Sequence, residues 1–177
     1  FGTIGTNTKY RKNGVIKKLA TTPLSKFEWI IGLVLYHMLI GIISTIVILT
    51  VAVLVFNINI ILNPVIIILI ISGALTFPGL GMIISTVVRE EEEADAAGNV
   101  VTFPMLFLSG TFFPLETMPT VIQAIARILP LTYLNNGLRE IMIYGNYQAA
   151  LWNCSIVFAI GIVTIAIAMK VTRWTDL

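Results

Sequence analysis

Charged residues are scarce in this sequence. They make up 11% of its 177 residues, whereas hydrophobic residues make up 57% and the mean hydropathy is +0.94. Soluble domains carry about 25% charged residues, so this composition excludes that class. We therefore expect an integral membrane protein in which residues 1–177 form one transmembrane domain.

Residue types that carry catalysis or bind metals are also few. Cys154 is the only cysteine and His37 the only histidine, so no intrachain disulfide and no cluster of thiolate ligands can form. The sequence has no G-x-S-x-G, no H-E-x-x-H and no phosphate-binding G-x-x-x-x-G-K-[ST] pattern. We expect no enzyme activity, no metal site and no cofactor in this chain. His37 is expected to be neutral and to bond across a helix interface.

Long apolar runs predict four membrane-spanning helices, since the hydrocarbon core is about 30 Å thick and needs about 20 apolar residues. We place these helices at 27–57, 64–88, 95–113 and 149–171. A basic tract with interleaved aromatic residues is missing, so no nucleic-acid partner is expected. The fold class is thus an all-α membrane protein.

Four prolines interrupt the apolar stretch from Phe103 to Arg139. Proline removes a backbone donor and blocks a continuous helix, so a single straight span cannot contain this stretch. The backbone groups that are freed must be satisfied within protein or beside water. We predict a helix that breaks at 109–114 and a broken or re-entrant helical segment over 114–145, which together are a candidate gate. The prolines are Pro104, Pro114, Pro119 and Pro130.

Lysine and arginine are distributed unevenly around the four expected spans. Six lie before the first span, Arg89 follows the second, and Lys170 and Arg173 follow the last, which gives nine on one side. Only Arg127 and Arg139 fall on the other side. By the positive-inside rule, 9–26 is expected to be cytoplasmic and 114–146 extracellular, in the cell (plasma) membrane.

The basic loop before the first span contains a short amphipathic pattern. Val15, Ile16 and Leu19 fall on one helical face, and Pro23 ends the pattern. We predict a cytoplasmic helix within 9–25 that lies parallel to the membrane. From the residues alone, a helix that merely rests on lipid is an equal alternative.

Two patterns resemble motifs of the membrane subunits of ABC-2 type exporters. The inner loop resembles that family's coupling helix, of the form R-x-x-G-x-x-x-x-L-x-x-TP-x-S-x-x-E. Its matching residues are Arg11, Gly14, Leu19, Thr22, Pro23, Ser25 and Glu28. The broken stretch resembles LSG-x-FFP-x-x-x-MP followed by LP-x-TY and LR. Its matching residues are Leu108, Ser109, Gly110, Phe112, Phe113, Pro114, Met118, Pro119, Leu129, Pro130, Thr132, Tyr133, Leu138 and Arg139.

The resemblance implies the carboxy-terminal part of a six-span permease that works by alternating access on an amphipathic or apolar substrate, drug-like or lipid-like. It implies a partner ABC ATPase that binds ATP and Mg, a second permease copy, identical or not, and contact with lipid. The implied coupling residues are Arg11, Gly14, Val15, Lys17, Lys18, Leu19 and Pro23. The implied gate and substrate path comprises Phe103, Phe107, Ser109, Gly110, Phe112, Phe113, Pro114, Pro119, Pro130 and Tyr133, with Arg139 at the outer interface. An uncoupled channel and a membrane interaction or assembly module are the alternatives.

Overall fold

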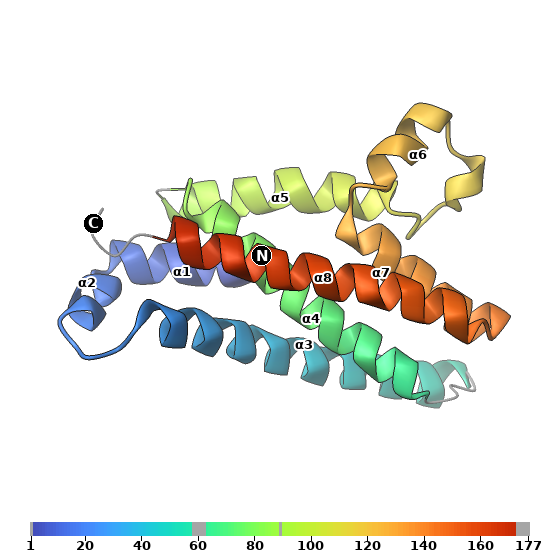
Figure 1. Cartoon of the computed structure of the whole chain (residues 1–177), viewed down its shortest axis with the longest axis horizontal. Coiled ribbons are helices and arrows are strands. Elements are labelled where there is room, and N and C mark those ends of the chain that lie inside the picture. Colours follow the sequence, from blue (N-terminus) through green and yellow to red (C-terminus); the bar gives the residue numbers. More distant parts are fainter. Residues whose placement is uncertain (1, 58–62, 89, 173–177) are drawn as a thin grey trace.

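The computed structural model describes residues 2–57, 63–88 and 90–172, and its regular elements are all helical (Figure 1). The predicted all-α class is therefore confirmed. The α-helices are α1 (Gly2–Lys12), α2 (Val15–Ala20), α3 (Lys26–Phe56), α4 (Pro64–Ser85), α5 (Glu91–Leu108), α6 (Thr120–Ala126), α7 (Pro130–Arg139) and α8 (Tyr147–Val171). A 3-10 helix η1 (Leu115–Thr117) and a π-helical turn η2 (Glu140–Tyr144) complete them.

Three of the described helices are long and apolar enough to cross a membrane. They occupy Phe27–Phe56 in α3, Pro64–Ser85 in α4 and Tyr147–Val171 in α8. The third expected span, 95–113, corresponds to α5, which ends at Leu108 and begins with the three glutamates Glu91 to Glu93. Length and composition therefore support three spans, and a membrane crossing by α5 stays a prediction.

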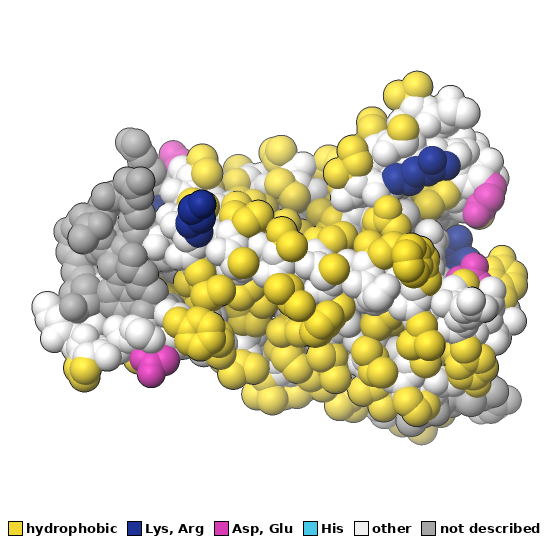
Figure 2. Space-filling model, in the orientation of Figure 1, with side chains coloured by type: hydrophobic (Ala, Val, Ile, Leu, Met, Phe, Trp, Pro, Cys, Tyr) yellow, Lys and Arg dark blue, Asp and Glu magenta, His cyan; other side chains and the backbone are white. Residues whose placement is uncertain are grey.

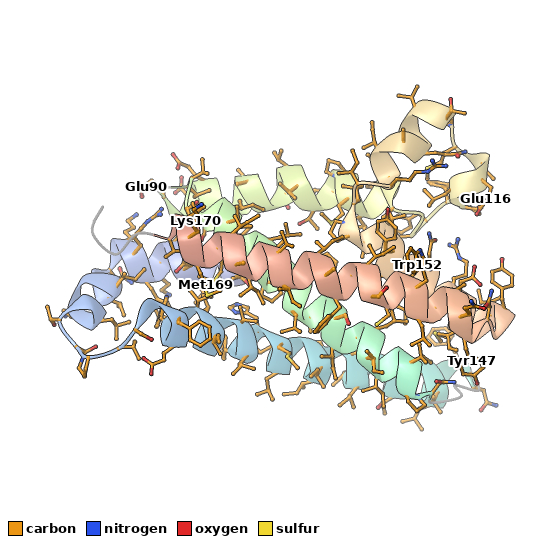
Figure 3. The ribbon with its side chains drawn as sticks, viewed as in Figure 1. Glu90, Glu116, Tyr147, Trp152, Met169 and Lys170 are labelled. Atoms are coloured by element: carbon orange, nitrogen blue, oxygen red, sulfur yellow. The ribbon has the colours of Figure 1, made fainter. Side chains whose placement is uncertain are left out.

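The helix α4 lies at the centre of the bundle, between α3 and α8 (Figure 1). Half of the residues in its most apolar 18-residue stretch are buried, whereas none are in the corresponding stretch of α3, whose buried residues lie near its start at Ile30, Leu33 and Val34. Hydrophobic side chains cover the middle of the face in Figure 2, and charged side chains lie near its two ends. Figure 3 places Glu90 and Lys170 at one of these ends and Glu116 and Tyr147 at the other. The long exposed surface of α3 is thus suited to lipid.

Small residues let α4 and α8 pack closely. A β carbon on Gly79 would lie 2.6 Å from Thr164 Oγ1, and one on Gly161 would lie 2.8 Å from Thr76 Oγ1. The Thr76 hydroxyl is 2.9 Å from the Val157 carbonyl of α8, so it forms a hydrogen bond across this contact. Close backbone approach and interhelical hydrogen bonds hold helices together in lipid, where the hydrophobic effect is missing.

Polar caps set the beginnings of the long helices. Ser25 and Glu28 form a capping box at the start of α3, with the Ser25 amide 2.7 Å from the Glu28 carboxylate. Asn63 caps α4, whose first residue is Pro64, and Asn146 caps α8. Each cap satisfies amides that have no partner within the helix.

Candidate functional site

The basic inner loop forms a bent pair of helices, α1 and α2, which we call the inner elbow. The bend lies at Gly14, whose φ of 67° is left-handed and therefore suits glycine. A β carbon there would meet nothing within 4 Å, so conformation and not space explains the glycine. The bend separates α1 from α2, and α2 (Val15–Ala20) lies within the segment 9–25 for which we predict a helix.

The α2 helix turns part of its apolar face toward the rest of the chain. Ile16 is 4% exposed, whereas Val15 and Leu19 on the same face are half-buried. Lys18 is exposed, as is Pro23 in the turn before α3, and the Lys17 side chain lies outside the described part. Val15 and Leu19 thus offer the apolar surface of the elbow that remains for another chain or for lipid.

Arg11 binds within the chain. Its Nη1 donates a hydrogen bond of 3.0 Å to the carbonyl of Ser85, the last residue of α4. Asn7, one turn earlier on α1, donates to the Ser85 hydroxyl at 2.7 Å, and Lys12 forms an ion pair with Glu90. A cation at a helix C-terminus is favourable because the last carbonyls lack partners. Arg11 therefore anchors the elbow to the central helix.

At the other end of the bundle, α5 ends at Leu108 and the chain turns sharply through 109–113, which we call the outer break. Gly110 has a φ of 79°, and a β carbon on it would lie 3.1 Å from Leu115 Cγ. A residue with a side chain would be disfavoured here, because the backbone is left-handed and because the side chain would contact Leu115 closely.

Two side chains on one face of α7 hold the outer break. Asn135 Nδ2 donates to Thr111 Oγ1 at 2.7 Å and lies 3.3 Å from Ser109 Oγ. Arg139, one turn further along α7, donates from Nη2 to the Gly110 carbonyl at 2.9 Å. These bonds tie the end of α5 to a helix that packs on α4 and α8.

Between the outer break and α7, prolines and hydroxyl groups define two short helices. Pro114 precedes η1, Pro119 precedes α6, and Pro130 is the first residue of α7. At the start of a helix the backbone amide forms no hydrogen bond within the helix, so a proline there costs none. Thr132 donates to the Ala126 carbonyl and Tyr133 to the Arg127 carbonyl, both at 2.6 Å. Side chains of α7 therefore cap the C-terminus of α6.

The phenylalanines of the expected gate form an aromatic surface at the outer break. Phe107 and Phe112 stack with ring centroids 5.2 Å apart, which joins α5 to the turn. Phe103, Phe112 and Phe113 are more than half exposed, and Phe107 is 49% exposed. None of the four rings is buried in this chain, so any closure that they provide would be against another surface.

The prediction that His37 forms a hydrogen bond across a helix interface was wrong. Its Nδ1 is 2.9 Å from the carbonyl of Leu33, four residues earlier in α3 itself. The adjacent ring of Tyr36 meets it edge-on at 5.1 Å. The bond is local because the carbonyl one turn earlier is within reach of the ring.

The comparison with known proteins covers both regions described above, the inner elbow and the outer break. A family model described as ABC-2 type transporter matches residues 1–143, which include the inner elbow and the outer break. The chain belongs to the ABC-2 type transporter family. No solved structure matches it.

One relative extends the match over α8, and two others match shorter parts of the chain. The linearmycin resistance permease protein LnrN of Bacillus subtilis is 34% identical over 175 residues, which are 98% of this chain and 45% of that protein. The ABC transporter G family member 20 of Dictyostelium discoideum is 32% identical over 77% of this chain and 19% of its own length. The probable multidrug ABC transporter permease YbhS of Escherichia coli is 35% identical over 41% of this chain and 20% of its own. The chain thus spans less than half the length of these relatives.

Proposed function

We propose that this chain is part of an ABC exporter's permease subunit, which moves an amphipathic or apolar substrate out of the cell. The observation that carries the proposal is the position of the two motif regions. The inner elbow and the outer break lie at opposite ends of the same apolar bundle (Figure 1). Such an arrangement suits a transporter in which a conformational change at one membrane face opens a path for substrate at the other.

At the inner face, the elbow is the contact for a partner ATPase. Its bend at Gly14 exposes Lys18 and leaves Leu19 half-buried, so an apolar knob lies beside a positive charge. The bonds of Arg11 and Asn7 to Ser85 connect α1, the helix that precedes α2, to α4. A push on α2 would therefore reach the centre of the bundle. ATP and Mg belong to that partner.

At the outer face, the break with its aromatic rings is the gate. The rings of Phe107 and Phe112 are exposed and stacked, so a second permease copy, identical or not, can meet them and close the path. Asn135 and Arg139 hold the break in place. In this proposal α5 also crosses the plasma membrane, the elbow is cytoplasmic, and 114–146 is extracellular.

The substrate class follows from the scarcity of charge. The spans offer aromatic rings, aliphatic side chains and hydroxyl groups, which suit molecules that already partition into membranes. The names of two relatives, a linearmycin resistance permease and a probable multidrug permease, support drug-like cargo.

The test is coupling at Leu19 in the complete permease, copurified with its ATPase. Leu19→Asp replaces an apolar contact with an unpaired charge, which should abolish export and the stimulation of ATP hydrolysis by substrate while membrane insertion is retained. Leu19→Met keeps an apolar side chain of similar volume and should behave as wild type. If the aspartate variant exports normally with normal ATPase stimulation, the elbow merely lies on lipid and the proposal fails.

A further inference from the structure

A cavity of about 420 Å³ lies among α1, α3, α4 and α7. It touches the inner elbow only at the start of α1, at Gly2 and Thr3, and its lining includes neither the bend at Gly14 nor the outer break. His37 lines it, ten residues after Phe27, or about 15 Å along the helix from the start of the span. Its other walls are mainly apolar. They include Gly41, Thr45, Gly73, Phe77, Leu134 and Leu138.

His37 gives this cavity one hydrogen-bond acceptor. The Leu33 carbonyl can only accept a hydrogen bond, so the contact at 2.9 Å assigns the proton of the neutral ring to Nδ1. The lone pair of the ring is then on Nε2. This atom forms no hydrogen bond with the described residues. An acceptor in an apolar cavity gains most from a ligand that brings a donor.

Glycines keep the cavity and the ring accessible. A β carbon on Gly41 would meet nothing within 4 Å, so open space faces that position one turn after His37. A β carbon on Gly2 would lie 3.2 Å from His37 Nε2, so a side chain there would crowd the acceptor. The backbone of both residues is compatible with other amino acids, since neither has a positive φ. The open space is thus a property of the site that a substitution can remove.

Thr45 does not compete for the acceptor. Its hydroxyl donates to the Gly41 carbonyl at 2.8 Å, within α3. No lysine, arginine, aspartate or glutamate is among the lining residues. The site therefore offers no counter-charge to an ionic ligand, and a neutral donor such as a hydroxyl group fits best.

We propose that this cavity binds an apolar molecule that carries a hydroxyl group. The hydroxyl donates to His37 Nε2, and the hydrocarbon part packs against Phe77, Leu134 and Leu138. Both exported cargo and a resident membrane alcohol have this chemistry. The site stands independently of the proposed export function, because binding needs neither the ATPase nor the gate.

The test measures quenching of a tryptophan placed in the cavity. The protein is the complete permease in lipid nanodiscs, with every other tryptophan replaced by phenylalanine. Phe77→Trp supplies the reporter. Leu138→Trp is the second reporter if the first variant does not fold. The probes are bromododecanol and bromododecane, which differ by the hydroxyl group. Gly41→Leu fills the open space, and Gly32→Leu, also on α3 and facing open space, is its matched control. His37→Phe keeps a ring and removes the acceptor.

Half-maximal quenching by the alcohol should need a roughly five-fold lower concentration in the wild type than in His37→Phe, as one net hydrogen bond predicts. It should also need a lower concentration in the wild type than in Gly41→Leu, in which leucine occupies the open space. Gly32→Leu should match the wild type. His37→Phe should leave quenching by the alkane unchanged, since the alkane does not use the acceptor. Equal quenching by the alcohol in the wild type and both cavity variants would overturn the proposal, as would loss of alkane quenching in His37→Phe.

Two further measurements identify the source of the ligand once the site is established. If the ligand is cargo, Gly41→Leu lowers export of that cargo while basal ATP hydrolysis continues. If it is a resident lipid, a hydroxyl-bearing lipid detected by mass spectrometry in the wild type is lost from Gly41→Leu and export is retained. Either result supports the site, whereas a Gly41→Leu variant that retains both the cargo export and the lipid of the wild type counts against it.

Discussion

The guanidinium group of Arg139 donates a hydrogen bond of 2.9 Å to the carbonyl of Gly110, and this bond joins α7 to the turn that ends α5. Gly110 has a left-handed φ, so the carbonyl points out of the helical path and needs a partner from elsewhere. Arg139 supplies a charged donor, which makes a stronger bond than a neutral one. The outer break is thus held by α7, in addition to the constraint from Pro114 that follows it.

Removal of this donor should destabilise the outer break. We expect Arg139→Gln to lower the free energy of unfolding by about 1–2 kcal/mol, the range for a partly exposed bond to a charged group. Hydrogen exchange at the Gly110 and Thr111 amides should become faster. Arg127→Gln is the matched control, because it removes the same charge at the same end, and the Arg127 side chain forms no hydrogen bond with the described residues. Equal effects of the two substitutions would contradict the role of Arg139.

The contact of α4 with α8 predicts a second sensitive position. Gly79→Ala places a β carbon 2.6 Å from Thr164 Oγ1, so the helices must separate, at a cost of about 1–3 kcal/mol in thermal unfolding. Gly32→Ala, whose β carbon faces open space, should be neutral or stabilising by up to about 1 kcal/mol. Thr164→Ala combined with Gly79→Ala removes the nearest atom and should recover part of the loss. A double variant as unstable as Gly79→Ala would show that this contact is not the cause.

The all-helical fold could be predicted because long apolar runs leave few alternatives in a membrane. The bend of the inner elbow was missed, although Asn13 and Gly14 form a dipeptide typical of turns. The amphipathic pattern of Val15 to Leu19 gave no hint that the preceding helix runs on to Lys12. A helical period reports which residues share a face, and it does not report where one helix stops and the next begins.

The motif positions point to only some of the residues that form the hydrogen bonds described above. Arg11 and Arg139 were selected from motif positions, but their neighbours Asn7 and Asn135 were not. Each asparagine lies four residues before its arginine, so each pair shares one helical face, and this spacing was a signal in the sequence. The partner Ser85 could not be found this way. It is 74 residues from Arg11 in the chain, and only the packing of α1 on α4 brings the two together.

The proposed topology predicts which positions an impermeant thiol reagent can reach. In a Cys154→Ala background, a cysteine at Thr117 should react in intact cells, because Thr117 is exposed beyond the outer break. A cysteine at Thr22, exposed after the inner elbow, should react only after the cells are permeabilised. Membrane-free purified protein should label at both positions, which controls for local accessibility. Labelling at Thr22 from outside would reverse the assigned orientation.

Pro114 and Pro119 offer the strongest test of the gate. Pro114 has φ −56° and ψ 134° before η1, and Pro119 has φ −56° and ψ 148° before α6, so both hold extended backbone between helices. Each proline also disfavours a helical conformation in the residue before it, and Met118 is indeed extended. Alanine at both positions lifts these restrictions and restores two amide donors. We expect the α-helical content to rise and the stacking of Phe107 on Phe112 to be lost.

The functional consequence of this double substitution should be a defective outer seal. Pro costs about 3 kcal/mol relative to Ala inside a helix, which is enough to favour a longer continuous helix once both prolines are gone. Expression and copurification with the ATPase should be retained, while export is lost or the closed transporter leaks small solutes from loaded proteoliposomes. Pro64→Ala is the control, because Pro64 is the first residue of α4, where alanine is equally compatible with the helix. Wild-type export with an unaltered seal in the double variant would limit these prolines to shaping an outer loop, and the assignment of the gate would then have to be withdrawn.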